Sequence, residues 1–248
     1  MHKGLKTQGF SQGIFQQSQF QTEYLDTVRV LEDGRAFAYS RAGAADLAPG
    51  KVTISAIPVS GQNHQNRALA VAAAVGATTI LCTLGTAVTD NYYQNGWMHM
   101  NDCGAGTGEA YVYRIKSHPS GTTAVPFDLL DPIRLVCTTA AQASFTKNRQ
   151  SLVVVLPVAA AVMVSTAAGV PAIVVTAGYY FWNQVKGPAA VLAGGTLAIG
   201  EEVGPDVTIA GAILALVHAT GTDVTLGTCM DIAGDTQYAT INLSIAGY

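Results

Sequence analysis

Residues 27–40, TVRVLEDGRAFAYS, predict a β-hairpin. Two valines alternate with other residues, Asp33-Gly34 suits a tight turn, and Phe37 and Tyr39 alternate on the returning strand. Beyond it, short β-branched and aromatic runs are separated by turn signals at intervals of about 8–12 residues, which is typical of barrels and sandwiches and not of βαβ folds. The sequence therefore predicts a mainly β protein, a β-barrel or β-sandwich built from hairpins.

Ten further strands are expected along the chain. They are residues 51–59, a run through Met98 and Met100, and residues 78–84, 110–116, 152–156, 172–175, 179–185, 207–217, 225–232 and 238–245. In the last run, alternate residues from Ala239 to Ile245 are apolar and should face a core. Turns are expected at Gly187-Pro188 and Gly194-Gly195, and one short helix over 65–75.

Charge divides the chain at about residue 150. Residues 1–150 contain twelve Lys or Arg and ten Asp or Glu, whereas residues 151–248 contain one and six, so the parts carry +2 and −5. We therefore expect an extended N-terminal arm (1–24), a β-rich domain (25–150) and a barrel or sandwich domain (151–248). Net charge −3 gives no general attraction for phosphate, so no nucleic-acid partner is expected.

Only 12% of the residues are charged, about half of the usual share. A neutral surface of Thr, Ser, Asn, Gln and Gly is typical of a protein covered by other subunits, or of an extracellular β-protein. The first 22 residues contain no apolar signal core, so we expect synthesis in a cytoplasm. Four widely spaced cysteines, Cys82, Cys103, Cys137 and Cys229, are expected to be reduced and mostly buried.

Two uncharged stretches, 68–88 and 151–185, are long enough to span a bilayer. Pro and Gly divide the second into strand-sized pieces, and no Lys/Arg cluster flanks either stretch. We therefore expect buried strands and no membrane partner.

The N-terminal segment 1–24 is polar with isolated large side chains. It is either a frayed terminus or an arm whose aromatic residues fill pockets on a neighbouring subunit. The arm hypothesis makes Phe10, Phe15, Phe20 and Tyr24 interface candidates. On the aromatic run that follows Gly178, Tyr180 and Trp182 share one face, which we expect to be a subunit contact or a surface patch.

No motif selects a catalytic, metal-binding or cofactor-binding site. The run Gly104, Gly106, Gly108 has Glu109 where a third nucleotide-loop glycine would stand, and predicts a hairpin loop. His99 and Cys103, with Asp102, make half a zinc site at most. The carboxylate pairs Glu32-Asp33, Glu201-Glu202 and Asp231/Asp235 fall at expected turns.

Four blocks of the sequence resemble a family of tailed-bacteriophage virion structural proteins, the auxiliary head proteins known as decoration or cement proteins. These blocks are residues 28–51, 96–119, 129–135 and 178–192. The resemblance implies a non-enzymatic protein, made in host cytoplasm and located on the capsid surface of the virion. It implies the major capsid protein as a partner and a homo-oligomer, a dimer or trimer on a symmetry axis.

Two other functions remain open from the sequence. A tail or fibre component that binds a receptor or carbohydrate would expose aromatic residues along a groove. A β-fold hydrolase would bring together carboxylates with perturbed pKa values.

Overall fold

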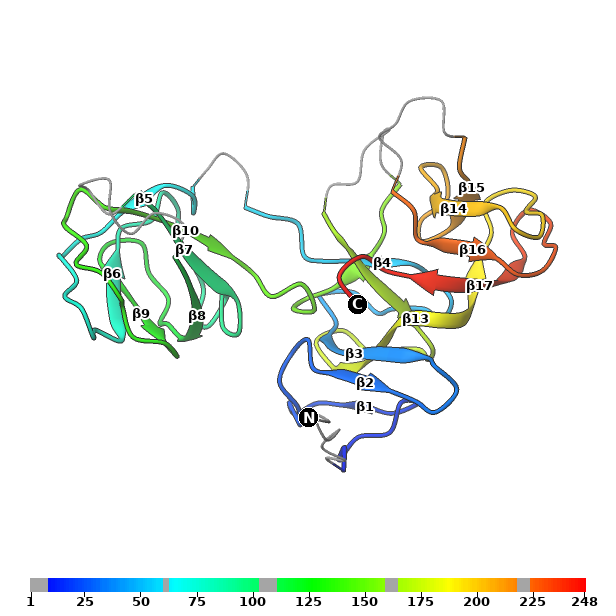
Figure 1. Ribbon diagram of the computed structural model, residues 1–248, viewed down its shortest axis with the longest axis horizontal. Coiled ribbons are helices and arrows are strands. Elements are labelled where there is room, and N and C mark those ends of the chain that lie inside the picture. The colour runs from blue at the N-terminus through cyan, green and yellow to red at the C-terminus, as the bar shows by residue number, and fades with distance from the viewer. Residues whose placement is uncertain (1–8, 60–62, 103–110, 159–164, 218–223) are drawn as a thin grey trace, which may run out of the picture. The chain divides into compact units, whose positions relative to one another are not determined.

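The computed structural model describes residues 9–59, 63–102, 111–158, 165–217 and 224–248. Within these ranges the chain forms 17 strands and no helix (Figure 1). The mainly β architecture predicted from the sequence is therefore confirmed. The short helix expected over 65–75 is wrong, because these residues form a two-residue strand followed by turns.

The strands belong to two compact units. Unit 1 comprises Met1–Ala56 and Gln150–Tyr248, and unit 2 comprises Ile57–Arg149. Unit 1 contains an 11-stranded sheet of β1 (Gln17–Ser18), β2 (Val28–Val30), β3 (Ala36–Arg41), β4 (Thr53–Ile54), β11 (Val154–Val155), β12 (Ala167–Pro171), β13 (Tyr180–Leu192), β14 (Glu202–Pro205), β15 (Ile213–Ala215), β16 (Gly227–Cys229) and β17 (Tyr238–Ser244). Unit 2 contains a six-stranded sheet of β5 (Arg67–Ala68), β6 (Thr79–Cys82), β7 (Trp97–Asp102), β8 (Val112–Ser117), β9 (Val125–Leu129) and β10 (Gln142–Thr146).

The units divide the chain differently from the expected domains 25–150 and 151–248. Residues 25–56 belong with the last part of the chain, because β3 pairs with β13 from Tyr180↔Arg41 to Lys186↔Ala36. The hairpin predicted for residues 27–40 is present, with Val28 opposite Ala38. Its two strands complete the sheet of unit 1, and the shift of charge along the chain does not mark this pairing.

Strand β13 is the longest strand and pairs with four others: β1, β3 and β12 along its first half, and β17 along its second half, from Lys186 to Leu192. The turn expected at Gly187-Pro188 is wrong. Gly187 adopts φ 83° within the strand, and the register against β3 shifts between Gln184 and Lys186. A glycine accommodates this irregularity because it lacks a Cβ atom.

Unit 1 contains the same strand arrangement twice. In module A, residues 36–56 and 150–186, the pairing order is β3-β13-β12-β4-β11. In module C, residues 186–248, the order is β13-β17-β16-β14-β15. Each module also has a parallel bridge at the equivalent place, Ala42↔Val153 in module A and Ala193↔Ile213 in module C. The two modules therefore share strand β13.

Unit 2, which we call module B, repeats much of this plan. Its first and last strands pair (β5 with β10), as do β6 and β9, which correspond to β4 and β12 of module A. The β7-β8 hairpin, which the sequence predicted, takes the place of β11. Module B is inserted in the chain between β4 and β11, so it is nested within module A, whereas module C follows module A.

A pair of short turns joins the strands in every module. The bridges at the turns are Leu47↔Val175, Ala73↔Cys137 and Leu197↔Ala233, and in each the two backbone N–H groups donate to the partner carbonyl at 2.8–3.3 Å. These six residues are buried. The first turn of each pair reads LAPG (47–50), AAVG (73–76) or LAIG (197–200), and each final glycine has φ between 72° and 87°. The run 172–175, expected to be a strand, contributes only the bridge at Val175.

The cores follow the alternation of the strands. On β17 and just beyond it, Ala239, Ile241, Leu243 and Ile245 are all buried, as the sequence predicted. The described cysteines, Cys82, Cys137 and Cys229, are buried free thiols. Burial raises the pKa of Cys82 to about 12, so that side chain is an inert core residue.

We expect Gly227→Ala to destabilise the protein by about 3 kcal/mol. An added Cβ at Gly227 would lie 2.3 Å from the backbone oxygen of Asn242, so β16 could no longer pair closely with β17. Gly234→Ala is the matched control, since its Cβ would meet nothing closer than 3.3 Å, and should change stability by less than about 0.5 kcal/mol. Chemical denaturation measures the free energy of unfolding of both variants. Equal values would contradict the close approach of β16 to β17 at Gly227.

Candidate functional site

The described part of the N-terminal arm lies on its own chain. Strand β1 pairs with β13 at Gln17↔Phe181 and Ser18↔Tyr180. The amide nitrogen of Gln12 donates to the backbone oxygen of Tyr180 at 3.0 Å, and its amide oxygen accepts from the hydroxyl of Tyr39 at 2.9 Å. The expectation that the whole arm lies on a neighbouring subunit therefore does not hold for these contacts.

Trp182 is covered by this arm. Its side chain has no exposed surface, and its indole N–H donates to the backbone oxygen of Gln12 at 3.0 Å. The ring of Phe10 meets the Trp182 ring edge-on, with centroids 5.2 Å apart, and the Arg29 guanidinium lies 4.9 Å from the centroid of Phe10. Both faces of the aromatic run are therefore covered within one chain, and the prediction that Trp182 belongs to a surface patch or subunit contact is corrected.

The remaining arm aromatics are on the surface. Phe15 is 61% exposed, Phe20 77% and Tyr24 67%. Tyr180 is half-buried and stacks on Tyr39, with ring centroids 6.0 Å apart. The six residues singled out from the sequence therefore separate into two that anchor the arm, Phe10 and Trp182, one at the edge of that cluster, Tyr180, and three whose rings are exposed, Phe15, Phe20 and Tyr24.

The sequence analysis missed a second group of exposed apolar side chains, which lies on the paired turns. Val75 and Val136 in module B are each 59% exposed, and Ile199 and Ile232 in module C are 67% and 73% exposed. The signal that reveals them is the repeat LAPG, AAVG, LAIG: the residue before each glycine lies on the surface, while the first residue of each is buried. The sequence does not show that these turns pair with each other, so the repeat cannot be distinguished there from ordinary turn sequence.

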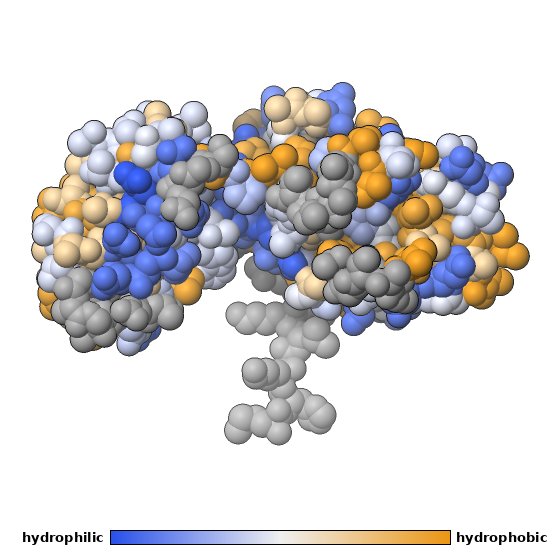
Figure 2. Space-filling view, turned by 90° about the horizontal axis from the view of Figure 1, so that it is seen from above, coloured by the Kyte–Doolittle hydropathy of each residue, from blue (hydrophilic) through white to orange (hydrophobic). Residues whose placement is uncertain are grey.

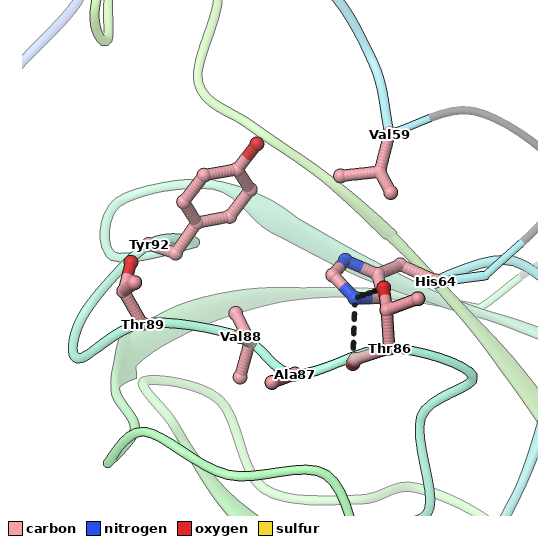
Figure 3. A pocket seen from close by; sticks show the side chains of 7 residues that line it. All are labelled: Val59, His64, Thr86, Ala87, Val88, Thr89 and Tyr92. Atoms are coloured by element: carbon pink, nitrogen blue, oxygen red, sulfur yellow. Dashed lines mark hydrogen bonds between the residues drawn. The ribbon is translucent and has the colours of Figure 1, made fainter.

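Unit 2 has a small pocket of about 130 Å³ beside His64 (Figure 3). It is lined by Val59, His64, Thr86, Ala87, Val88, Thr89 and Tyr92. Nε2 of His64 lies 3.1 Å from both the backbone oxygen and the hydroxyl of Thr86, and Nδ1 lies 2.7 Å from the Tyr93 hydroxyl. Both ring nitrogens are thus engaged inside the protein, which suits a structural histidine better than a general base.

A second buried histidine, His118, also contacts Tyr93, with ring centroids 6.0 Å apart. Its Nε2 accepts the backbone N–H of Tyr93 at 2.9 Å, which places the proton on Nδ1, 2.9 Å from the oxygen of Pro119. Burial lowers the pKa of both His64 and His118. Lys147 has its ammonium 3.5 Å from the Tyr92 ring centroid, and burial lowers its pKa to about 8.

The other sequence-derived candidates are dispersed. His99 and Asp102 lie on β7, whereas Cys103 and the run Gly104 to Gly108 with Glu109 fall outside the described residues. Within the described ranges, no three His, Cys, Asp or Glu side chains come together as a possible metal site. Asp33 receives the backbone N–H and Nε–H of Arg35, and these hydrogen bonds lower its pKa. Glu201 accepts the backbone N–H of Ala198, and Asp231 that of Thr240, so these carboxylates stabilise turns.

In the part of the chain that the structure covers, no helix has the length and apolar character needed to cross a membrane. No family model, no curated protein and no solved structure matches the chain.

We expect Phe10→Ala to destabilise unit 1 by about 2 kcal/mol, because it removes the ring that covers Trp182. In a Trp97→Phe background, which leaves Trp182 as the one tryptophan, its fluorescence should shift to the red. Phe20→Ala should change neither property, since that ring is 77% exposed. If the emission maximum of Phe10→Ala is not shifted from that of the Trp97→Phe parent, Phe10 does not shield Trp182 from water.

We expect unit 2 to lose stability as the pH falls below about 6.5, the ordinary pKa of histidine. Burial, the largest cause, lowers the pKa of His64 and His118 in the folded state. Arg67 and Lys147 also lower the pKa of His64, whereas Asp90 opposes the shift at His118. The unfolded chain then binds protons that the folded chain does not, so stability decreases from about pH 6.5 towards the lowered folded values.

The check is urea denaturation at about pH 7.5 and about pH 5.5. His118→Gln, which keeps an acceptor for the backbone of Tyr93, should reduce the loss at acid pH. Stability that rises on acidification would show that the two histidines are not buried in the neutral form.

Proposed function

We propose that this protein is a non-enzymatic structural protein of a tailed-phage virion, a decoration or cement protein on the outside of the capsid shell. In this role it binds the major capsid protein as a homo-oligomer and stabilises the joints between capsomers. The proposal rests on the family resemblance of the sequence blocks and, in the structure, on one observation: large apolar side chains stand exposed on a chain with few charges.

Large exposed aromatic side chains gathered on one short segment favour a partner surface. Phe15, Phe20 and Tyr24 project from an arm that is already fixed to its own chain by Phe10 and Gln12. Their positions are therefore preorganised, and a partner need not supply the free energy to order the arm. A standard specific interface buries about 1,600 Å², and many copies on one shell make the gain in shell stability collective.

The test is binding to head shells of the encoding phage that lack this protein. We expect the full chain to cosediment with these shells, and the double variant Phe15→Ser, Phe20→Ser to bind at least about tenfold more weakly, a loss of about 1.4 kcal/mol. Val30→Ser is the matched control, because Val30 is 63% exposed but lies on β2 and not on the arm segment that carries Phe15 and Phe20. Truncation of residues 1–22 is a poorer test, because it also removes Phe10 and Gln12 from Trp182.

One outcome would overturn the proposal, and a second would remove the arm from it. If the wild-type protein does not bind head shells but binds purified tails, the result supports the tail or fibre alternative. Equal binding of the wild type and the double variant would show that the arm is not the contact.

A further inference from the structure

All three modules expose an apolar pair at the same place on their paired turns. The two positions are the residue before the glycine of the first turn and the residue before the bridge of the second turn. The pairs are Pro49 and Val174, Val75 and Val136, and Ile199 and Ile232. The bridge residues beside them are buried and hold the two turns together. Folding therefore requires apolar side chains at the bridge positions but not at these exposed positions. Three recurrences of an outward apolar pair indicate a surface used for contact.

The tip of module C, formed by Ile199, Met230 and Ile232, is the most exposed of these surfaces. Gly200 donates its backbone N–H to Cys229 at 2.9 Å, which places Met230 beside Ile199. Figure 2 shows hydrophobic residues gathered at the right of the view, over the part of unit 1 that contains β14 to β17.

Carboxylates surround this tip. Glu201 follows the first turn, and Asp231 and Asp235 flank Ile232 and the second turn. Residues 187–248 contain six Asp or Glu and no Lys or Arg. Two such tips would repel each other, so this surface does not pair with itself across a two-fold axis. Its partner must be apolar and must bring positive charge.

A second copy of this chain offers such a surface. Unit 2, which is module B, contains six Lys or Arg and five Asp or Glu, a surplus of one positive charge, in contrast to residues 187–248, whose charges are all negative. On the tip of module B, the paired turns around the Ala73↔Cys137 bridge, Val75 and Val136 are each 59% exposed, and the exposed Arg134 lies two residues before Val136. Asp131 is the acidic residue nearest to them in the chain.

We propose that the tip of module C in one copy docks on the tip of module B in a second copy. The inference rests on the homo-oligomer in the proposed function and names its contact. The two surfaces differ, so each copy gives one tip and receives the other, and around a rotation axis the contact closes a ring of two or more copies. Each contact is small, and ring closure makes its contribution collective.

The experiment is sedimentation velocity of the full chain over a range of concentrations. We expect a reversible ring, and Ile232→Ser or Val136→Ser should each raise its dissociation constant at least about tenfold. Both side chains are exposed, so the variants should unfold at the wild-type temperature, and Ile199→Ser provides a second variant of the same tip. Val30→Ser is the control and should leave the dissociation constant unchanged. Asp131→Asn removes a negative charge near Arg134 and should leave the ring at least as stable as that of the wild type.

A charge exchange tests the pairing itself. Arg134→Glu and Asp235→Arg should each weaken the ring, and the double variant should restore it at least in part, because opposite charges again face each other. A wild-type chain that stays monomeric, or a double variant no better than either single one, would overturn the docking. Shell binding is measured separately, so a monomer that binds shells would refute this contact and leave the proposed function intact.

Discussion

The structure of unit 1 depends on strand β13 hydrogen-bonding to both of its modules. Its first half closes module A against β3, and its second half closes module C against β17. Gly187 lies where the strand passes from one module to the other and absorbs the irregularity with a positive φ. The N-terminal arm adds β1 to the first half of the same strand and covers Trp182. One 13-residue segment thus aligns two cores and the arm.

Repetition of a module explains how a chain with few charges can be stable and still carry apolar surface. Inside each pair of turns, reciprocal backbone hydrogen bonds and two buried side chains fix the geometry. The side chains at the outward positions do not contribute to this geometry, so they can contact another molecule. Valine, isoleucine or proline occupies these outward positions in every module.

Local patterns made the strand content predictable. The hairpin at residues 27–40 and the alternation in β17 follow from period-two patterns that need only neighbouring residues. Long-range pairing was not predictable, because nothing in the sequence near β3 says that it pairs with β13 rather than with the strands that follow it. The helix expected over 65–75 failed for a related reason: an alanine-rich run has helical propensity, but here its backbone bonds to residues 133–141. For the candidate site, spacing identified the exposed arm aromatics but could not show that the arm folds back over Trp182.

Electron cryomicroscopy of the proposed source virion would show whether the exposed apolar surfaces are buried in a repeated assembly on the shell. We expect ordered density for many copies on the head, with Phe15 and Phe20 against a partner and turn tips in contact between copies. Heads without this density, or copies whose arm aromatics and turn tips all face solvent, would contradict this expectation.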